Sequence, residues 1–277
     1  MTVTHRIEST VGATPVNAYL VEGESRIVAI DSTLTVSGGR ALRQRINEIG
    51  KPLAALVVTH AHPDHYGGAV ETITDSDAPI IATAGVDAII RRDDPIKEEI
   101  LRPMFGDQWP AQRAFPTQIV QDGAELSYDD INLTVRDLGP AESPHDSIWF
   151  LGDDQRAVFS GDLAYNHVHA YLADGYWQNW LTHIDTLSTD LPADAVLHPG
   201  HGEPTSRSLL AWQRTYIETV IEAIHAADWT DPDRATYDAL EAITAYLDTQ
   251  TLRFLMELSI QPLAATLTAN PPPTMRA

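Results

Sequence analysis

Four side chains that can bind a metal ion lie within six positions, in the segment HAHPDH at residues 60–65. In an extended backbone, residues i and i+2 point to the same side, so His60 and His62 can bind one ion. Pro63 ends regular strand pairing and forces a turn, which lets Asp64 and His65 reach a second ion close by. Imidazole and carboxylate groups suit zinc, manganese or iron. A general acid/base cluster and a chance polar loop are the alternatives, but the complete string after an apolar run favours a metal site.

Two metal sites need more ligands than these four side chains, and further candidates follow other apolar runs. A carboxylate directly after RAVFSG can bridge two cations through its two oxygens. Two histidines lie in HPGHG, and three further candidate ligands lie in GPAESPHDS. In that order, the candidates are Asp162, His198, His201, Glu142, His145 and Asp146. Each fragment alone is typical of an ordinary turn or surface loop, so the argument rests on their shared position at the ends of predicted strands.

The pattern of apolar residues predicts strands and helices that alternate along the chain. Residues 16–31 read as a β-hairpin around EGES, and residues 37–49 have helical spacing. A continuous apolar run at 53–59 suits a buried strand directly before HAHPDH. Further strands are predicted at 78–83, 131–138, 147–152, 156–161 and 194–200, and further helices at 208–227 and within 231–268. This order predicts an α/β layered fold, in which ligand crevices lie beyond the strand ends.

Composition restricts the possible partners. The 277 residues include 39 acidic and 18 basic ones, for a formal net charge of −21. Such a surface repels phosphate backbones, so we expect no nucleic-acid partner. The chain has no cysteine, which excludes thiolate ligands and thiol nucleophiles. It shows neither a signal-peptide pattern nor an apolar run long enough to cross a membrane, so we expect a cytoplasmic protein that acts on a small-molecule substrate.

The ordered motifs resemble those of the metallo-β-lactamase-fold hydrolases. The resemblance covers roughly residues 5–225. It rests on HAHPDH (60–65), FSGDL (159–163) and HPGHG (198–202), with support from VNAYLV (16–21) and IVAIDST (27–33). The first motif is highly specific and the others are less so. The resemblance implies an α/β (α+β) fold, a four-layer αββα sandwich with a dinuclear metal site at one edge between its two sheets.

The resemblance also implies a role for each matching residue. His60 and His62 would bind the first metal, and Asp64, His65 and His201 the second. Asp162 would bridge the two ions, and Asp31 would orient a ligand histidine, unless it only caps a strand end. An Asp rather than a Cys at the bridging position matches the glyoxalase II-like and lactonase-like branches better than the antibiotic-hydrolysing lactamases.

One ligand position departs from the family pattern. Most members have a histidine in a GPAHT-like string, whereas this chain reads GPAES and has Glu142 there. Alkylsulfatase-like members also use Glu, so we expect Glu142 to be the third ligand of the first metal, with His145 as the rival and a solvated loop residue as the alternative. A carboxylate in place of an imidazole favours harder ions such as manganese or iron.

Two segments are expected to shape the substrate pocket. The loop at 164–177 is rich in aromatic residues and offers His169 or Tyr171 as a group that polarises the substrate, although packing is an alternative role for either. The segment 95–118 contains several prolines, which predicts short helical turns over the sheet rather than one long helix. A hydrophobic strap that closes the core is the alternative for this segment.

The predicted activity is metal-dependent hydrolysis of an ester, lactone, thioester or amide-like bond in a small molecule. Two divalent ions, with zinc as the first candidate, lower the pKa of a bridging water and polarise the substrate, while Asp64 orients the resulting hydroxide and transfers a proton. A sulfatase, a phosphodiesterase and a non-hydrolytic iron oxidoreductase are the alternatives. We expect one catalytic domain at 1–227 and a helical extension at 228–277 that ends in a disordered tail. The helices of this extension would cover the site, pack on the core or form a homodimer interface.

Overall fold

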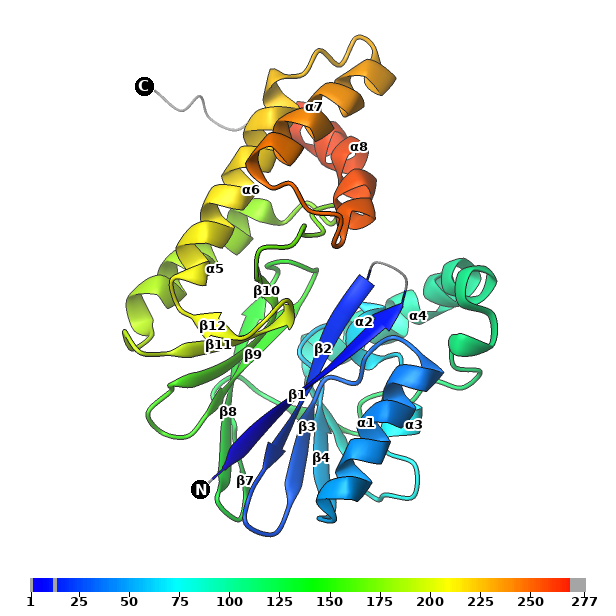
Figure 1. The fold of residues 1–277 in the computed structure, drawn as a ribbon, viewed down its shortest axis with the longest axis vertical. Coiled ribbons are helices and arrows are strands. Elements are labelled where there is room, and N and C mark those ends of the chain that lie inside the picture. Colours follow the sequence, from blue (N-terminus) through cyan, green and yellow to red (C-terminus); the bar gives the residue numbers. More distant parts are fainter. Residues whose placement is uncertain (1, 12–13, 270–277) are drawn as a thin grey trace.

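The computed structural model describes residues 2–11 and 14–269, within which two six-stranded sheets pack against each other (Figure 1). The strands of the first sheet pair in chain order, antiparallel for the first three and parallel thereafter. They are β1 (Val3–Val11), β2 (Thr14–Glu22), β3 (Ile27–Ile30), β4 (Leu53–Val57), β5 (Ile80–Thr83) and β6 (Gln118–Val120). The parallel pairing of β3, β4 and β5 brings the ends of these strands to one edge of the sheet.

The second sheet contains the remaining strands in reverse chain order. They are β12 (Thr205–Ser206), β11 (Val196–His201), β10 (Ala157–Tyr165), β9 (Asp146–Leu151), β8 (Ile131–Gly139) and β7 (Glu125–Tyr128). β10 and β11 are parallel, and the other neighbours in this sheet are antiparallel. The parallel pair matters for function, because each of its strands contributes one of the predicted metal ligands.

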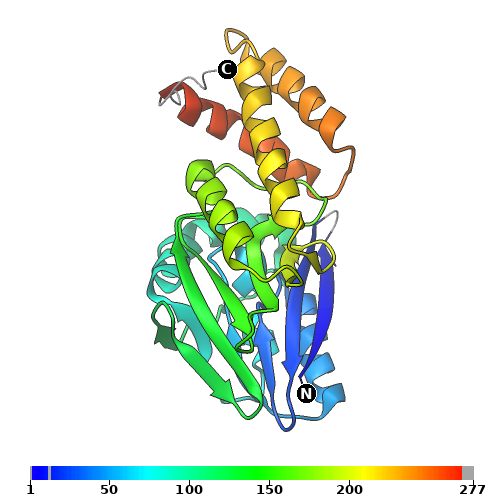
Figure 2. The same ribbon diagram turned by 90° about the vertical axis from the view of Figure 1, so that its left-hand side faces the viewer.

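Three apolar clusters separate the layers of the fold. Tyr19, Val57, Trp149 and Phe159 belong to the cluster between the sheets. A second cluster lies between the first sheet and its helices, and a third lies between the second sheet and its helices. The helices of the first sheet are α1 (Val36–Ile49), α2 (Pro63–Tyr66), α3 (Ala69–Thr72) and α4 (Ala84–Phe105), and those of the second include α5 (Trp177–Asp190) and α6 (Leu209–Ala226). This arrangement confirms the αββα sandwich (Figure 2).

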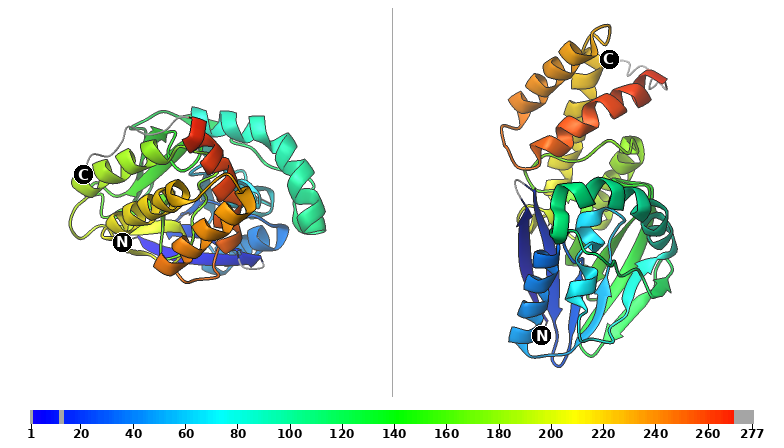
Figure 3. Two further views of the ribbon diagram at one scale, coloured as in Figure 1. Left: turned by 90° about the horizontal axis from the view of Figure 1, so that it is seen from above. Right: turned by 90° about the vertical axis from the view of Figure 1, so that its right-hand side faces the viewer.

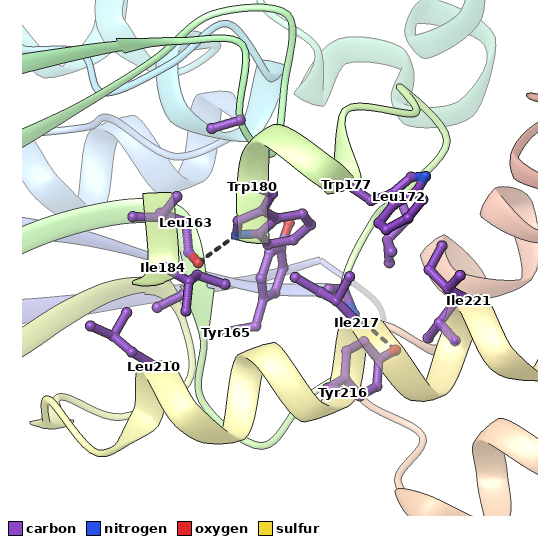
Figure 4. Packing of buried hydrophobic residues seen from close by; sticks show 14 of the residues in the cluster. Leu163, Tyr165, Leu172, Trp177, Trp180, Ile184, Leu210, Tyr216, Ile217 and Ile221 are labelled. Atoms are coloured by element: carbon purple, nitrogen blue, oxygen red, sulfur yellow. Dashed lines mark hydrogen bonds between the residues drawn. The ribbon is translucent and has the colours of Figure 1, made fainter. Parts of the chain in front are cut away.

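The C-terminal helices continue the core of the second sheet. They are α7 (Pro232–Tyr246) and α8 (Arg253–Ala269), and they confirm the two helices predicted within 231–268. Ile243 and Met256 belong to the same buried cluster as Trp180 of α5, part of which is shown in Figure 4. Within the described part of the chain, the helices are all too short or too polar to cross a membrane. The domain boundary at 227/228 stays a prediction, and the tail predicted to be disordered, residues 270–277, lies outside the described residues, which end at 269.

The expectation of short turns over 95–118 is wrong. α4 runs unbroken to Phe105 with Pro95 and Pro103 inside it, and a 3₁₀ turn, η1 (Gly106–Gln108), follows. The segment between η1 and β6, residues 109–117, returns along the helix and is bound to it. Its Arg113 donates from Nε and Nη2 to the two carboxylate oxygens of Asp94, at 2.8 and 2.7 Å. These contacts hold the segment against α4 next to Pro95.

The returning segment also fits the alternative of a strap over the core. The Trp109 ring is fully buried, and its Nε1 donates to Glu98 Oε2 at 2.7 Å. The guanidinium carbon of Arg113 lies 5.3 Å from the centre of the Trp109 ring. A single arginine therefore connects the strap to Asp94 and Glu98, which lie one turn apart on the same face of α4.

We expect Arg113→Ala to lower the free energy of unfolding by about 2–3 kcal/mol, because it removes paired, charge-assisted hydrogen bonds in a poorly solvated place. Both side chains of this pair are 11% exposed. Arg92→Ala is the matched control, since Arg92 is 59% exposed and pairs with its chain neighbour Asp93, and it should change stability by less than about 0.5 kcal/mol. Urea denaturation of both variants measures the difference. Equal effects would show that the strap does not depend on Arg113.

Candidate metal centre

Seven side chains with metal-binding atoms converge at one edge of the two sheets. They form two groups, and within each group one ligand atom per residue lies within 4.8 Å of the others. The first group is His60, His62, Glu142 and Asp162, and the second is Asp64, His65 and His201. The structure therefore brings together all seven residues predicted as metal ligands. The binding of metal by each of them stays a prediction.

The backbone of HAHPDH explains how one short segment serves both groups. His60 follows β4 and forms an isolated bridge with Asp146 at the start of β9, which ties the first sheet to the second. His62 keeps an extended conformation as the N-cap of α2, and Pro63 occupies the first turn of that helix. Asp64 and His65 then project from the helical turn. The turn expected at Pro63 is present.

In the first group, Glu142 lies between the two histidines. Its Oε2 is 3.0 Å from His62 Nδ1 and 3.8 Å from His60 Nε2. On the other side of His62, Nε2 is 3.2 Å from Asp174 Oδ2. Because a carboxylate only accepts hydrogen bonds, Asp174 favours a proton on Nε2 and leaves Nδ1 facing Glu142.

Asp162 connects the two groups. Its Oδ1 is 3.3 Å from His65 Nε2, and its Oδ2 is 3.2 Å from His201 Nε2 and 3.9 Å from His60 Nε2. Asp64 Oδ2 completes the second group at 3.4 Å from His201 Nε2 and 4.0 Å from His65 Nε2. The position of Asp162 is that of a carboxylate that can bridge two cations.

Asp31 fixes the orientation of two imidazoles. His65 Nδ1 donates to Asp31 Oδ2 at 2.8 Å, and the backbone N–H and hydroxyl of Thr59 donate to the same carboxylate. Since the Thr59 hydroxyl is used as a donor, its oxygen can accept from His60 Nδ1, 3.0 Å away. Both rings therefore present the lone pair of Nε2 to the cluster, as in many protein metal sites. Asp31 performs both predicted roles, orienting a histidine and closing a strand end.

His201 is oriented from the first sheet. Its Nδ1 lies 2.5 Å from the carbonyl oxygen of Pro15, while Asn17 Nδ2 and the Tyr19 hydroxyl donate to the Pro199 carbonyl at 2.9 and 2.7 Å. A side chain at Gly200 is excluded, because its Cβ would lie 2.0 Å from a carboxylate oxygen of Asp162. The HPGHG segment thus needs glycine where its backbone passes the cluster.

Five buried ligand atoms of the cluster lack a hydrogen-bond partner within the described residues. They are Nε2 of His60, His65 and His201, Oε2 of Glu142 and Oδ1 of Asp162. Burying polar atoms without partners costs free energy, and several such atoms facing one another are rare in an ordinary core. Cations in the two groups would satisfy all five atoms. The donor set and the fold therefore indicate divalent metal binding.

The charge balance of the cluster points the same way. Burial is the largest influence on each member, and it opposes the charged form. Burial lowers the pKa of His201, but Asp162 and Asp64 together outweigh it and raise that pKa to about 10. For Asp162, burial raises the pKa, but His201 and His65 outweigh it and bring the pKa well below its usual value. Burial raises the pKa of Glu142 to about 8. Without a metal, the negative charge of the Asp162 carboxylate is thus compensated by protons on the neighbouring imidazoles.

Glu142, and not His145, faces the cluster. His145 Nε2 lies 2.6 Å from Asp137 Oδ1, and its ring occupies the space that a side chain at Gly85 would need. The Asp137 carboxylate raises the pKa of His145 above its usual value. The Glu142 loop is held by Asp146, whose Oδ2 accepts from the backbone N–H and hydroxyl of Ser143 at 2.8 and 2.9 Å.

The two predicted substrate-polarising residues have different surroundings. His169 is buried, and its Nδ1 lies 3.0 Å from the Tyr216 hydroxyl under α6, away from the cluster. Packing, the alternative for this residue, describes it better. Tyr171 lies beside the cluster, with its ring 5.4 Å from the ring of His62. His198 packs on Tyr19 and Phe159 between the sheets and is not among the seven.

Sequence reasoning missed two residues at the cluster. The hydroxyl of Tyr165 lies 2.6 Å from Asp162 Oδ2 and 3.1 Å from Glu142 Oε1, so it can donate to either carboxylate. Asp174 contacts His62 from a loop more than a hundred residues away in sequence. Tyr165 has a weak signal, since it lies three residues after Asp162 in the same strand. Asp174 has none.

A cavity of about 270 Å³ opens beside the cluster. Its polar lining includes His62, Asp64, Asp162 and Tyr165, and Tyr171 also lines it. The rest of its wall comes from α4, α8 and a few residues near the first sheet. The volume is just below the ~300–1,000 Å³ common for small-molecule sites. The metal-binding groups can therefore be reached by a small ligand.

Three curated proteins share sequence similarity with the chain. The uncharacterized protein YobT of Bacillus subtilis is 47% identical over 53 residues, which span 19% of this chain and 22% of YobT. An (R)-specific secondary-alkylsulfatase of a Pseudomonas species is 37% identical over 68 residues, 24% of this chain and 10% of that protein. The hydroxyacylglutathione hydrolase GloC of Haemophilus influenzae is 26% identical over 173 residues, 61% of this chain and 79% of GloC. The chain thus matches only a small part of the first two relatives.

Solved structures show the same fold. A beta-lactamase domain protein from Burkholderia ambifaria superimposes with a TM-score of 0.71 at 17% identity, over 96% of this chain and 86% of that one. A metallo-beta-lactamase from Pontibacter korlensis superimposes with a TM-score of 0.61 at 19% identity, over 78% and 94% of the two chains. The family model of the metallo-beta-lactamase superfamily matches residues 11–201, more than half of the chain. Together with the αββα sandwich, this match shows that the chain belongs to the metallo-β-lactamase superfamily.

Proposed function

We propose that the protein is a hydrolase that uses two divalent metal ions to cleave an ester, lactone, thioester or amide-like bond in a small molecule. The observation that carries the proposal is the set of five buried ligand atoms that face one another without hydrogen-bond partners. The superfamily consists mostly of metal-dependent hydrolases, which agrees with this chemistry.

The charges of the donor set support two ions rather than one. With neutral imidazoles, the cluster carries the three negative charges of Asp64, Glu142 and Asp162. One divalent ion leaves a net negative charge in a buried place, whereas two ions leave a single positive charge that a nucleophile or an anionic transition state can offset. The two separate groups of donors agree with two positions.

Zinc is the first candidate for these ions, because four of the seven donors are imidazoles. The carboxylate of Glu142 is a harder donor than the histidine common in relatives, so manganese and iron are the alternatives. When bound, such ions lower the pKa of water and polarise a substrate oxygen. The position of Glu142 beside His62 and His60 supports it as the third ligand of the first ion.

The remaining groups assign roles to this chain's own side chains. Asp64 is only partly buried and lines the cavity, so its carboxylate can orient a water molecule and accept its proton. Burial, and then the charge of Asp174, raises the pKa of Tyr171, so its hydroxyl remains protonated near neutral pH. Tyr171 can therefore donate a hydrogen bond to a substrate oxygen. Tyr165 holds the two central carboxylates in place.

A sulfatase acting on the same site is the second candidate. It is supported by the carboxylate at position 142 and by the local similarity to a secondary-alkylsulfatase. The longer similarity to a hydroxyacylglutathione hydrolase supports thioester hydrolysis instead. No comparable observation favours a phosphodiesterase or an iron oxidoreductase.

A panel of esters, lactones, thioesters and sulfate esters, assayed with the zinc-loaded protein, distinguishes the hydrolase activities. Absence of turnover on the whole panel would contradict the proposal.

Removal of metal should abolish hydrolysis and lower the melting temperature. When the free metal concentration is about 100 times the Kd, binding stabilises the native state by about 2.7 kcal/mol. This corresponds to a rise of roughly 5–10 °C in the melting temperature of a domain of this size. Treatment with EDTA, desalting, and a melting curve followed by far-UV circular dichroism measure the change, and added zinc should reverse it. Unchanged melting and unchanged activity after complete removal of metal would contradict the metal site.

Replacing Glu142 tests the assignment of the third ligand. Glu142→Gln should reduce the metal content from about two ions to one per chain, because a neutral amide is a weak ligand. Glu142→His should restore most of the ion that Glu142→Gln loses. His145→Ala is the matched control from the same loop and should retain both ions, since His145 pairs with Asp137 instead. Elemental analysis of the three variants purified side by side gives the answer. Loss of an ion in His145→Ala alone would reverse the assignment.

A further inference from the structure

Helix α8 has two apolar faces with different surroundings. One face contains Met256, Ile260 and Leu263, which are buried in the cluster shared with α6 and α7. The other face contains Phe254 and Leu258, one helical turn apart, and both line the cavity beside the metal cluster. A helix that only packed on its neighbours would carry polar residues on this second face.

Helix α4 presents a matching apolar stripe. Val86 and Ile90 are buried against the first sheet. Further along the helix, Ile100 and Met104 line the cavity and are 50% and 63% exposed. Leu258 on α8 is 59% exposed. These large apolar side chains thus remain in contact with solvent at the wall of the cavity, which needs an explanation in a protein with a charge of −21.

The two helices and the metal cluster enclose one continuous space. Both views of Figure 3 show α8 close to α4. The outer wall of the cavity is formed by Ile100, Leu101, Met104 and Phe105 of α4 and by Phe254, Leu255 and Leu258 of α8, and its inner end by His62, Asp64 and Asp162. Lys97 also lines the cavity. Burial raises the pKa of the nearby Asp174 carboxyl, but the hydrogen bond and charge of His62, and then the charge of Lys97, lower it below its usual value.

We propose that the cleft between α4 and α8 binds an unbranched apolar chain of the substrate and places the bond that joins it to a polar group at the metal cluster. The substrate class is therefore an ester or thioester of a medium-length fatty acid. This inference rests on the proposed function, since it identifies the substrate of the same site. The cleft provides apolar contact on two sides and few polar partners, which suits an alkyl chain better than a sugar, a peptide or a nucleotide.

Chain length should control both binding and turnover. Each methylene that enters the cleft contributes about 0.8 kcal/mol, which is about a fourfold gain per added carbon. The gain should stop when the chain extends past Met104 and Leu258 into solvent. Substrates with short acyl groups should be cleaved with much lower kcat/KM.

The test measures binding and turnover separately on the zinc-loaded protein. Isothermal titration calorimetry gives the affinity for butanoate, hexanoate, octanoate and decanoate, and p-nitrophenyl esters of the same acids give kcat/KM. We expect both to rise about fourfold per methylene at first. Met104→Gln and Leu258→Gln should each reduce the octanoyl-to-butanoyl ratio about tenfold. Both positions are exposed, so the variants should fold normally, which melting curves verify.

Ile96→Gln is the matched control. Ile96 lies on α4 and is 49% exposed, but it is not part of the cavity lining, so its replacement should leave the chain-length dependence unchanged. Ester hydrolysis with no dependence on chain length, or equal effects of the control and the two cleft variants, would overturn the inference and leave the proposed hydrolase intact. Chain-length-dependent binding of the carboxylates without turnover of any ester would support the cleft and contradict the hydrolase.

Discussion

The carboxylate of Asp31 is the contact on which the geometry of the metal-binding cluster depends. It accepts hydrogen bonds from His65 and from the backbone and hydroxyl of Thr59, and Thr59 in turn orients His60. Asp31 itself has a positive φ of 60°, a conformation that costs energy for a residue with a side chain. The surrounding contacts compensate for this cost. A single buried carboxylate thereby connects the ends of β3 and β4 and aims two imidazoles at one point.

The cluster then sets the conditions for the rest of the fold. Its carboxylates and imidazoles are removed from water, where their charges need compensation, and five of their atoms have no hydrogen-bond partner among the described residues. β4, β10 and β11 are each paired in parallel with neighbouring strands. This pairing fixes the backbone at the ligands, so their side chains have little freedom to reach other hydrogen-bond partners. Such a site needs no rearrangement before a cation binds, because folding has already brought the like charges together.

The C-terminal helices contribute to the site although they carry none of the seven ligands. Their inner faces extend the apolar cluster of the second sheet, and the remaining face of α8 forms a wall of the cavity together with α4. The seven candidate ligands therefore all lie in the sandwich, whose fold is that of the superfamily. Much of the cavity wall beside them comes from helices α4 and α8.

The spacing of HAHPDH and the polar residues after apolar runs predicted an α/β layered fold with polar clusters at its strand ends, because such patterns report on local backbone geometry. The four-layer sandwich and the set of seven ligands followed from the resemblance of these motifs to the family. Local patterns did not predict β1, β6, β7 or α5. The expectation of short turns at 95–118 was wrong, because α4 continues through Pro95 and Pro103 to Phe105. The contacts made in the folded chain turn Glu142 to the cluster and His145 to Asp137, and they bring Tyr165 and Asp174 to the site. The reason is physical: spacing along a strand is set by local backbone geometry, whereas the side to which a loop residue turns depends on partners that are remote in the sequence.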